Sequence, residues 1–164
     1  MFTIRPLSVT DGKDVYEFLQ RLGPEENGFV NKVNGMTYEE YRAWLKRQAD
    51  MAEGIGLEDG MVPQSTYWLL EDGVPVGIGR LRHRLTDALR EAGGVIGYGI
   101  DPLHRGRGCG KALLRLLLEE TKRIGMTDLL LTVRLGNIAS RKVAESCGGR
   151  LLRENEIRAF YEFH

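Results

Sequence analysis

The sequence is poor in the residues that hold metals or build disulfide frameworks. It has two cysteines, Cys109 and Cys147, which are too few for a small scaffold held together by disulfide bonds. Its three histidines, His83, His104 and His164, are scattered without the spacing of metal ligands. These shortages predict a protein that carries no metal.

The chain also lacks an excess of charge of one sign and a long apolar run. Its 23 Lys and Arg residues balance 23 Asp and Glu residues, so no broad field favours nucleic acid or an anionic membrane. No apolar run is long enough to cross a bilayer. The first residues lack the basic-then-apolar order of a signal peptide. We therefore expect a cytoplasmic protein with no nucleic-acid or membrane partner.

The succession of apolar patterns predicts a single domain of α/β (α+β) class over residues 1–164. The chain is long enough for one hydrophobic core, and no repeat or linker divides it. Helical and strand periodicities follow one another in the order β-α-α-β-β-β-α-β-α-β-β. Apolar strands at 94–100 and 128–134 flank a helix at 110–124, which predicts a parallel βαβ unit with a right-handed crossover.

Short signals mark where several of these elements begin and end. Thr37 and Glu40 have the spacing of a capping box at a helix start. Asp72 and Gly73 form a strong hairpin signal between two strands. Gly125 stands where the C-terminal cap of the third long helix belongs.

Glycines alternate with cationic residues just ahead of that helix, in the stretch HRGRGCGK. A helix start offers unpaired backbone N–H groups and a partial positive charge, which together attract anions. Glycines let those N–H groups turn toward a ligand, and Arg and Lys side chains add charge. The stretch therefore predicts a phosphate or pyrophosphate cradle made of Arg105, Gly106, Arg107, Gly108, Cys109, Gly110 and Lys111.

Two common phosphate-binding loops do not fit the stretch. A P-loop needs a glycine five residues before the Gly-Lys pair and Ser or Thr after it, but these positions hold Arg105 and Ala112. A dinucleotide fingerprint needs a third glycine where Lys111 stands. The cradle must therefore belong to another class.

The pattern Arg-x-x-Gly-x-Gly, formed by Arg105, Gly108 and Gly110, resembles the acetyl-CoA loop of the GNAT superfamily of N-acetyltransferases. The segment NIAS at 137–140, followed by Gly-Gly at 148–149, resembles the next conserved block of that superfamily. Longer phrases such as GYGIDPLHRGRGCG and NIASRKVAESCGG are similar to a branch of uncharacterised predicted bacterial acetyltransferases. The resemblance covers nearly the whole chain. It implies a mixed, mostly antiparallel sheet of about seven strands, with helices flanking the central parallel βαβ unit.

The resemblance implies acetyl-CoA as cosubstrate and direct transfer of its acetyl group to an amine. In the superfamily the fourth and fifth strands splay apart and pantetheine enters the gap, so backbone near Ile100 is expected to bind there and to polarise the thioester carbonyl. By position, residues 105–111 inherit the pyrophosphate, and Asn137 and Ser140 inherit contacts along pantetheine. The implied acceptor is a small-molecule amine or a protein N-terminus. Because look-alikes often dimerise, the resemblance leaves a homodimer open.

The general acid does not follow from the resemblance. Many GNAT enzymes supply a Tyr from one turn into the helix that Asn opens, but this chain has Ala144 there. Tyr98 on the fourth strand and Tyr161 on the last strand are the candidate acids, since a phenol with a pKa near ~10 donates a proton at neutral pH. Ser140 is the nearest remaining hydroxyl, and water is the other choice.

Several of these residues also fit plainer structural roles. Asn137 is a favoured helix cap, and Cys109 is expected too near the pyrophosphate to attack a thioester. Glu25 and Glu26 are either solvated loop charges or groups that face a cationic amine. Two other functions stay open: a CoA-binding sensor without turnover, which the alanine at position 144 favours, and an interaction module whose loop binds a different phosphate ligand.

Overall fold

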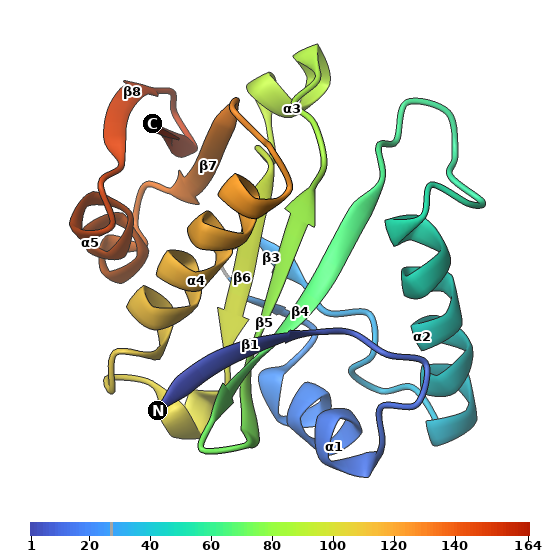
Figure 1. The fold of residues 1–164 in the computed structure, drawn as a ribbon. Coiled ribbons are helices and arrows are strands. Elements are labelled where there is room, and N and C mark those ends of the chain that lie inside the picture. The colour runs from blue at the N-terminus through green and yellow to red at the C-terminus, as the bar shows by residue number, and fades with distance from the viewer. Residues whose placement is uncertain (27) are drawn as a thin grey trace.

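Two β-sheets form the main framework of the protein, and the four-stranded one runs through its centre (Figure 1). The computed structural model describes residues 1–26 and 28–164. One sheet has the strand order β1-β4-β5-β6, formed by Phe2–Pro6, Gln64–Glu71, Val74–Arg82 and Ile96–Ile100. The other has the order β7-β9-β8, formed by Leu129–Arg134, Arg158–Phe163 and Arg150–Glu154. A short hairpin is formed by β2 (Glu25–Glu26) and β3 (Phe29–Val30).

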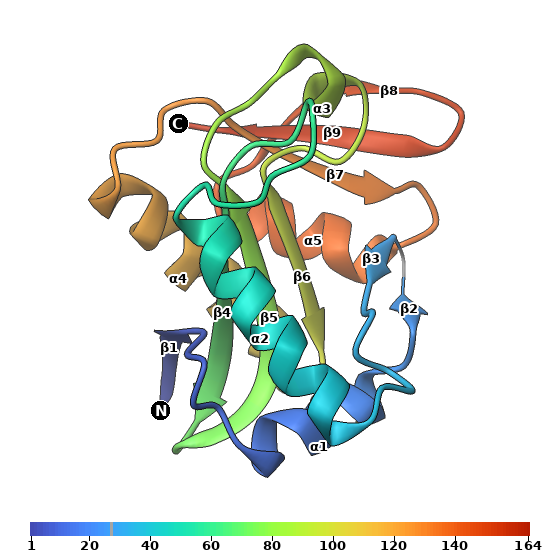
Figure 2. The same ribbon diagram turned by 90° about the vertical axis from the view of Figure 1, so that its right-hand side faces the viewer.

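Helices cover both faces of the four-stranded sheet. α1 (Lys13–Leu22) and α2 (Tyr38–Ala52) lie on one face, and α4 (Cys109–Arg123) lies on the other (Figures 1 and 2). α5 (Ile138–Ser146) packs beside α4, while α3 (Asp87–Glu91) and a 3₁₀ turn (Pro102–His104) flank β6. In the described part of the chain, no helix is both long and apolar enough to cross a membrane.

Each face of the sheet has its own apolar core, and the spacing of leucines explains how α4 builds one of them. Leu113 and Leu117, one turn apart, are both fully buried. Gly79 of β5 lets α4 approach closely, because a Cβ there would lie 2.8 Å from a methyl group of Leu117. On the opposite face, Phe18 of α1 packs against Trp68 of β4. The core on the α4 face extends under α5 and the three-stranded sheet.

The mixed α+β class and the seven main strands are confirmed, but the expected parallel pair is wrong. Every strand pair in the described residues is antiparallel. Where β6 and β7 meet, Val95 N–H donates to the Leu130 carbonyl at 2.8 Å. Gly94 permits this approach, because a Cβ there would lie 2.4 Å from the same carbonyl oxygen. Beyond it β6 stays with β5 and β7 stays with β9, so the two strands diverge (Figure 2).

The local signals read from the sequence are confirmed. Thr37 Oγ1 accepts from Glu40 N–H at 3.2 Å and Glu40 Oε1 accepts from Thr37 N–H at 2.9 Å, which completes a capping box at the start of α2. Asp72 and Gly73 have φ angles of 50° and 85° in the β4–β5 hairpin. Gly125 has a φ of 80° just after α4. These signals are short-range, so the sequence alone specifies them.

Candidate functional site

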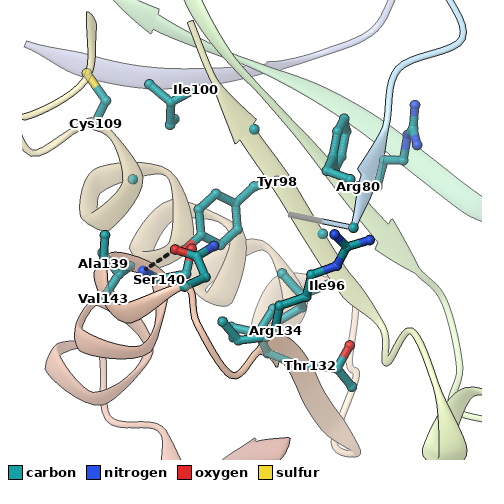
Figure 3. A pocket seen from close by; sticks show the side chains of 18 of the residues that line it. Arg80, Ile96, Tyr98, Ile100, Cys109, Thr132, Arg134, Ala139, Ser140 and Val143 are labelled. Carbon is teal, nitrogen blue, oxygen red and sulfur yellow. Dashed lines mark hydrogen bonds between the residues drawn. The ribbon is translucent and has the colours of Figure 1, made fainter. Parts of the chain in front are cut away.

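A cavity of about 530 Å³ opens where β6 and β7 separate (Figure 3). Its walls come from segments far apart in the sequence: β6, the glycine loop, the first turns of α4 and α5, β7 and the β2–β3 hairpin. Cys109 lies at one end, and Arg80 and Arg134 lie toward the other (Figure 3). The divergence of the two strands therefore creates a hollow that extends from the start of α4 across β6.

The start of α4 presents unpaired backbone donors to this cavity. Gly108 is the N-cap and has no side chain to cap the helix, and Ala112 N–H makes the first backbone bond, to the Gly108 carbonyl. The N–H groups of Cys109, Gly110 and Lys111 thus have no partner among the described residues. All three residues line the cavity. An anion there meets free N–H donors and the positive end of the helix dipole.

Gly106 and Gly108 are required by the conformation of the backbone. Their φ angles of 75° and 81° lie in the left-handed region, where a side chain costs about 1 kcal/mol or more. A Cβ at either position would meet no other heavy atom within 4 Å. The two glycines therefore turn the loop, and they do not serve to make room for a packed neighbour.

The three cations of the loop have different surroundings. Arg105 lines the cavity and donates from Nη2 to the Ile100 carbonyl at 3.2 Å, at the end of β6. Lys111 lines the cavity from the first turn of α4. Arg107 instead pairs with Glu71 at 2.7 Å and is not among the described lining residues. The sequence assigned Arg107 to the pyrophosphate, and in this structure its guanidinium is paired with the Glu71 carboxylate at the end of β4.

β6 offers its own backbone to the cavity. The strand pairs with β5 along one edge, and in an antiparallel ladder every second residue directs its N–H and C=O away from the partner strand. The other edge faces the gap, where residues 96–100 line the cavity. Ile100 lies at the end of this edge, close to the glycine loop. The edge can therefore pair with amide groups of a ligand.

Asn137, Ser140 and Tyr98 line the middle of the cavity. Asn137 Oδ1 accepts from Ser140 N–H at 3.2 Å and so caps α5, and the Tyr98 hydroxyl donates to Ser140 Oγ at 3.3 Å. Figure 3 shows the Tyr98 and Ser140 side chains side by side. Burial raises the pKa of Tyr98, and the hydrogen bond to Ser140 opposes this. The phenol therefore keeps its proton at neutral pH and can donate it.

The structure does not bring Tyr161 into the cavity. Its side chain is fully buried in the core, where its hydroxyl accepts from Arg141 Nε at 3.0 Å and donates to Glu145 at 3.1 Å. The alternation of side chains along a strand explains this placement, because Arg158 of the same strand lines the cavity and lies an odd number of positions away. Tyr98 is thus the candidate phenol that reaches the site.

The remaining sequence candidates contribute little chemistry. Ala144 is fully buried in the core, so position 144 offers no group to the cavity. Burial raises the pKa of the Cys109 thiol, and Glu71 adds to this effect, so the thiol is a poor nucleophile. His83 bonds to Ser65 Oγ at 2.7 Å, away from the described lining residues. Among the side chains that the structure describes, those of residues 26 and 27 excepted, no cluster of His, Cys, Asp and Glu is arranged to hold a metal ion.

The end of the cavity away from Cys109 is cationic, a feature that the sequence did not predict. Figure 3 shows Arg80 and Arg134 there; Phe29 stacks on Arg80, Arg158 is paired with Arg134, and Arg82 of β5 also lines the cavity. The signals in the sequence were Arg80 and Arg82, charged residues in a strand whose other positions are apolar or glycine. Arg134 of β7 and Arg158 of β9 reach the cavity through tertiary packing, which the sequence does not reveal.

Glu25 was a candidate for facing a cationic amine. Its carboxylate instead pairs with Arg134 at 2.9 Å and accepts from Gly28 N–H at 2.7 Å, which fixes the β2–β3 hairpin to β7. Glu25 is absent from the described lining residues. The side chain of Glu26, the other candidate, lies outside the described part of the structure.

Together these features define the class of ligand. An anion cradle at a helix start continues into a gap whose edge offers backbone hydrogen bonds. Such a cavity suits an extended molecule with a phosphorylated end and an amide-bearing arm. We therefore assign the chain to the class of proteins that hold a phosphorylated carrier between two splayed strands.

A family model described as Acetyltransferase (GNAT) family matches residues 26–149. The match spans most of the chain, and the chain belongs to the GNAT acetyltransferase family. The family resemblance read from the sequence is thereby confirmed. Comparison with curated proteins gives no match.

Solved structures share the fold at low sequence identity. A ribosomal-protein-S5-alanine acetyltransferase from Vibrio fischeri has a TM-score of 0.74 and 13% identity, covering 98% of this chain and 91% of that one. The putative acetyltransferase yncA from Salmonella typhimurium, solved with acetyl-CoA, has a TM-score of 0.64 and 18% identity, covering 100% and 94%. A spermidine N-acetyltransferase chimera from Vibrio cholerae and hSSAT has a TM-score of 0.65 and 15% identity, covering 99% and 94%. They support the fold but leave the acceptor undefined.

Proposed function

We propose that this protein transfers the acetyl group of acetyl-CoA to an amine. The observation that carries the proposal is a single cavity that joins unpaired N–H groups at the start of α4 to the open edge of β6. CoA combines a pyrophosphate with an arm that contains amides, which the N–H groups and the strand edge respectively fit. When bound, acetyl-CoA supplies the activated thioester.

The cradle residues have distinct roles in this proposal. The N–H groups of residues 109–111 bind the pyrophosphate, Gly106 and Gly108 shape the loop, and Arg105 and Lys111 add charge. Backbone near Ile100 positions the pantetheine arm and donates to the thioester carbonyl oxygen. Asn137 and Ser140 contact the arm from the side of α5.

Tyr98 is the proposed general acid. In direct transfer a C–N bond forms at the carbonyl carbon and the C–S bond breaks. Tyr98 Oη gives its proton to the departing sulfur, while the proton lost by the attacking amine passes to water. Ser140 Oγ, which accepts from Tyr98 at 3.3 Å, orients the phenol.

The proposal is tested by incubating the protein with acetyl-CoA and a panel of amines, and by following both thiol release and acetylated product. The proposal is supported if the wild-type protein forms acetylated product and the Gly108→Asp variant does not. CoA binding without turnover of any amine would identify a sensor instead. Binding of ATP or NAD in preference to CoA, measured by competition in a thermal-shift assay, would identify a module for another phosphate ligand.

A further inference from the structure

The charges that line the cavity fall into two groups. Among its described lining residues, none is Asp or Glu, whereas six are Arg or Lys: Arg80, Arg82, Arg105, Lys111, Arg134 and Arg158. Arg105 and Lys111 belong to the cradle, where the proposed function places a pyrophosphate. The other four belong to strands β5, β7 and β9, away from the cradle. The cavity therefore has a second anion-attracting region that the pyrophosphate does not use.

Arg80 is held firmly in this second region. Its guanidinium lies 4.5 Å from the centroid of the Phe29 ring, and Nη1 donates to the Val30 carbonyl at 3.0 Å. Nε is buried and has no hydrogen-bond partner among the described residues. Burial, with a smaller effect from Arg82, lowers the pKa of Arg80 to about 10, so the side chain is still charged at neutral pH. Arg80 is thus a cation held in one position, and some of its N–H groups are still available to a ligand.

The neighbouring side chains that the structure describes do not neutralise Arg80. Arg82 donates to the carbonyls of Gly93 and Gly94 at 3.3 and 3.0 Å. The Glu25 carboxylate forms an ion pair with Arg134 at 2.9 Å and not with Arg80. Among the side chains that the structure describes, which do not include that of Glu26, no carboxylate forms an ion pair with Arg80. A partly buried cation without a counter-ion is unfavourable, and a ligand that brings a negative charge relieves this cost.

The position of Arg80 beside β6 and the volume of the cavity favour a small acceptor. Arg80 is paired with Gly97, the residue before Tyr98. Gly97 has no side chain, and a Cβ there would lie 3.6 Å from the Phe29 ring. A group bound by Arg80 therefore lies at the register position next to Tyr98, beside the part of β6 that lines the cavity. The cavity of about 530 Å³ must also hold part of the pantetheine arm, which favours a small acceptor over a folded partner.

We infer that the acceptor is a small amine that carries a carboxylate, as a free α-amino acid does, and that Arg80 binds this carboxylate. An arginine offers parallel N–H donors that match the two oxygens of a carboxylate. The amine then lies next to the gap between β6 and β7, where the proposed function places the thioester. Polyamines are disfavoured, because their positive charges meet Arg80 and Arg158. This inference rests on the proposed function.

The test uses matched acceptors: phenylalanine, phenylalaninamide and phenethylamine, with the corresponding leucine, leucinamide and isoamylamine. Values of kcat/KM are compared at one pH after correction for the fraction of unprotonated amine. Binding of each acceptor to the protein–CoA complex is measured by calorimetry, which needs no turnover. We expect each amino acid to exceed both uncharged partners by at least about 10-fold. Arg80→Gln should remove about 10- to 100-fold of the preference, as expected for a lost charged hydrogen bond.

Controls separate this inference from the proposed function. Arg150→Gln, on β8 outside the described lining residues, should leave the preference unchanged, and Arg80→Lys should retain part of it because the charge remains. CoA affinity should be the same in all three variants. Equal use of phenethylamine and phenylalanine would overturn the inference while leaving acetyl transfer intact. Loss of CoA affinity in Arg80→Gln would also overturn it, because Arg80 would then belong to the CoA site.

The same experiment weighs the remaining classes of acceptor. A preference for spermidine over phenylalanine, or for a short peptide with acidic first residues over any free amino acid, would overturn the inference. Absence of turnover combined with carboxylate-selective binding that Arg80→Gln abolishes would support it and would contradict the proposed catalysis instead.

Discussion

The hydroxyl of Tyr98 lies 3.3 Å from Ser140 Oγ and joins β6 to α5 across the cavity. The contact couples two of the three hydroxyl groups that the sequence offered as proton donors. It also orients the phenol, whose pKa burial raises. Since the position that often supplies the acid in look-alikes is the buried Ala144, this pair is where the acid function is expected.

Tyr98→Phe should lower kcat by roughly 10²-fold with little change in CoA affinity, because it removes the proton donor but keeps the ring. Steady-state kinetics and calorimetry measure the two quantities. Tyr161→Phe is the matched control. It should keep kcat near the wild-type value and lose about 1 kcal/mol of unfolding free energy, since the core hydroxyl pairs with Arg141 and Glu145. An unchanged kcat in Tyr98→Phe would transfer the acid role to water or Ser140.

The raised pKa of Tyr98 sets the pH dependence of the acid step. A phenol whose pKa lies above its ordinary value of 10.0 stays protonated across the neutral range and loses its proton only above about pH 10. The profile of kcat should therefore show no alkaline decline from this group below about pH 10. A descending limb near neutral pH that Tyr98→Phe removes would contradict the assignment.

Gly108 separates the effects of charge and backbone on CoA binding. Its φ of 81° is tolerated by Asn and Asp better than by most residues, so Gly108→Asn and Gly108→Asp place similar side chains in the same conformation. The aspartate adds a negative charge beside the expected pyrophosphate. We expect CoA binding to be lost in Gly108→Asp and weakened much less in Gly108→Asn, as measured by calorimetry. Equal affinities in the two variants would remove the argument for an anion at this helix start.

The parts of this protein that were predictable from its sequence are those set by neighbouring residues. The capping box of Thr37 and Glu40, the Asp72-Gly73 turn and the glycine loop before α4 all depend on contacts within a few positions. The chemistry of a helix start follows from its free N–H groups. For this reason the cradle could be located before the fold was known.

The divergence of β6 from β7 was expected from the family resemblance alone, and the face occupied by Tyr161 did not follow from neighbouring residues. Both strands are apolar, and apolar runs do not reveal whether two strands pair along their length or touch at one end, as Val95 and Leu130 do. The burial of Tyr161 depends on which side of β9 packs under α5. Arg80 and Arg134 are 54 positions apart by their numbering, so packing alone brings them to one cavity.

The two exposed cations Arg107 and Lys111 should differ in their contribution to CoA binding. Lys111 lines the cavity, whereas Arg107 pairs with Glu71 at 2.7 Å. Lys111→Ala should weaken CoA binding by about twofold to fivefold, the range of an exposed ion pair. Arg107→Ala should change it by less than about twofold. Calorimetry at low and high salt measures CoA affinity in both variants. A larger loss of CoA affinity in Arg107→Ala than in Lys111→Ala would indicate that Arg107 does bind the pyrophosphate.

Asp101 anchors the end of β6 to α1 and makes the stability of the fold depend on pH. Its buried carboxylate accepts from Arg21 Nε at 2.9 Å and from Leu103 N–H at 2.9 Å. Burial alone would raise its pKa, but the hydrogen bonds from Leu103 and Arg21 lower it below the ordinary 3.8. The carboxylate therefore stabilises the folded state above about pH 4, and this contribution is lost as the pH falls through the lower, folded-state pKa.

Asp101→Asn should accordingly reduce the free energy of unfolding by about 2 kcal/mol at pH 7. This is less than the ~3–5 kcal/mol of a fully buried pair, because the Arg21 side chain remains 38% exposed and can be solvated. Below about pH 4 the difference between the variant and the wild type should shrink, since the unfolded wild-type chain then binds a proton at Asp101 before the folded one does. Urea unfolding at pH 7 and at pH 3 measures both differences. A deficit that is equal at the two pH values would show that the Asp101 charge has no part in holding the end of β6.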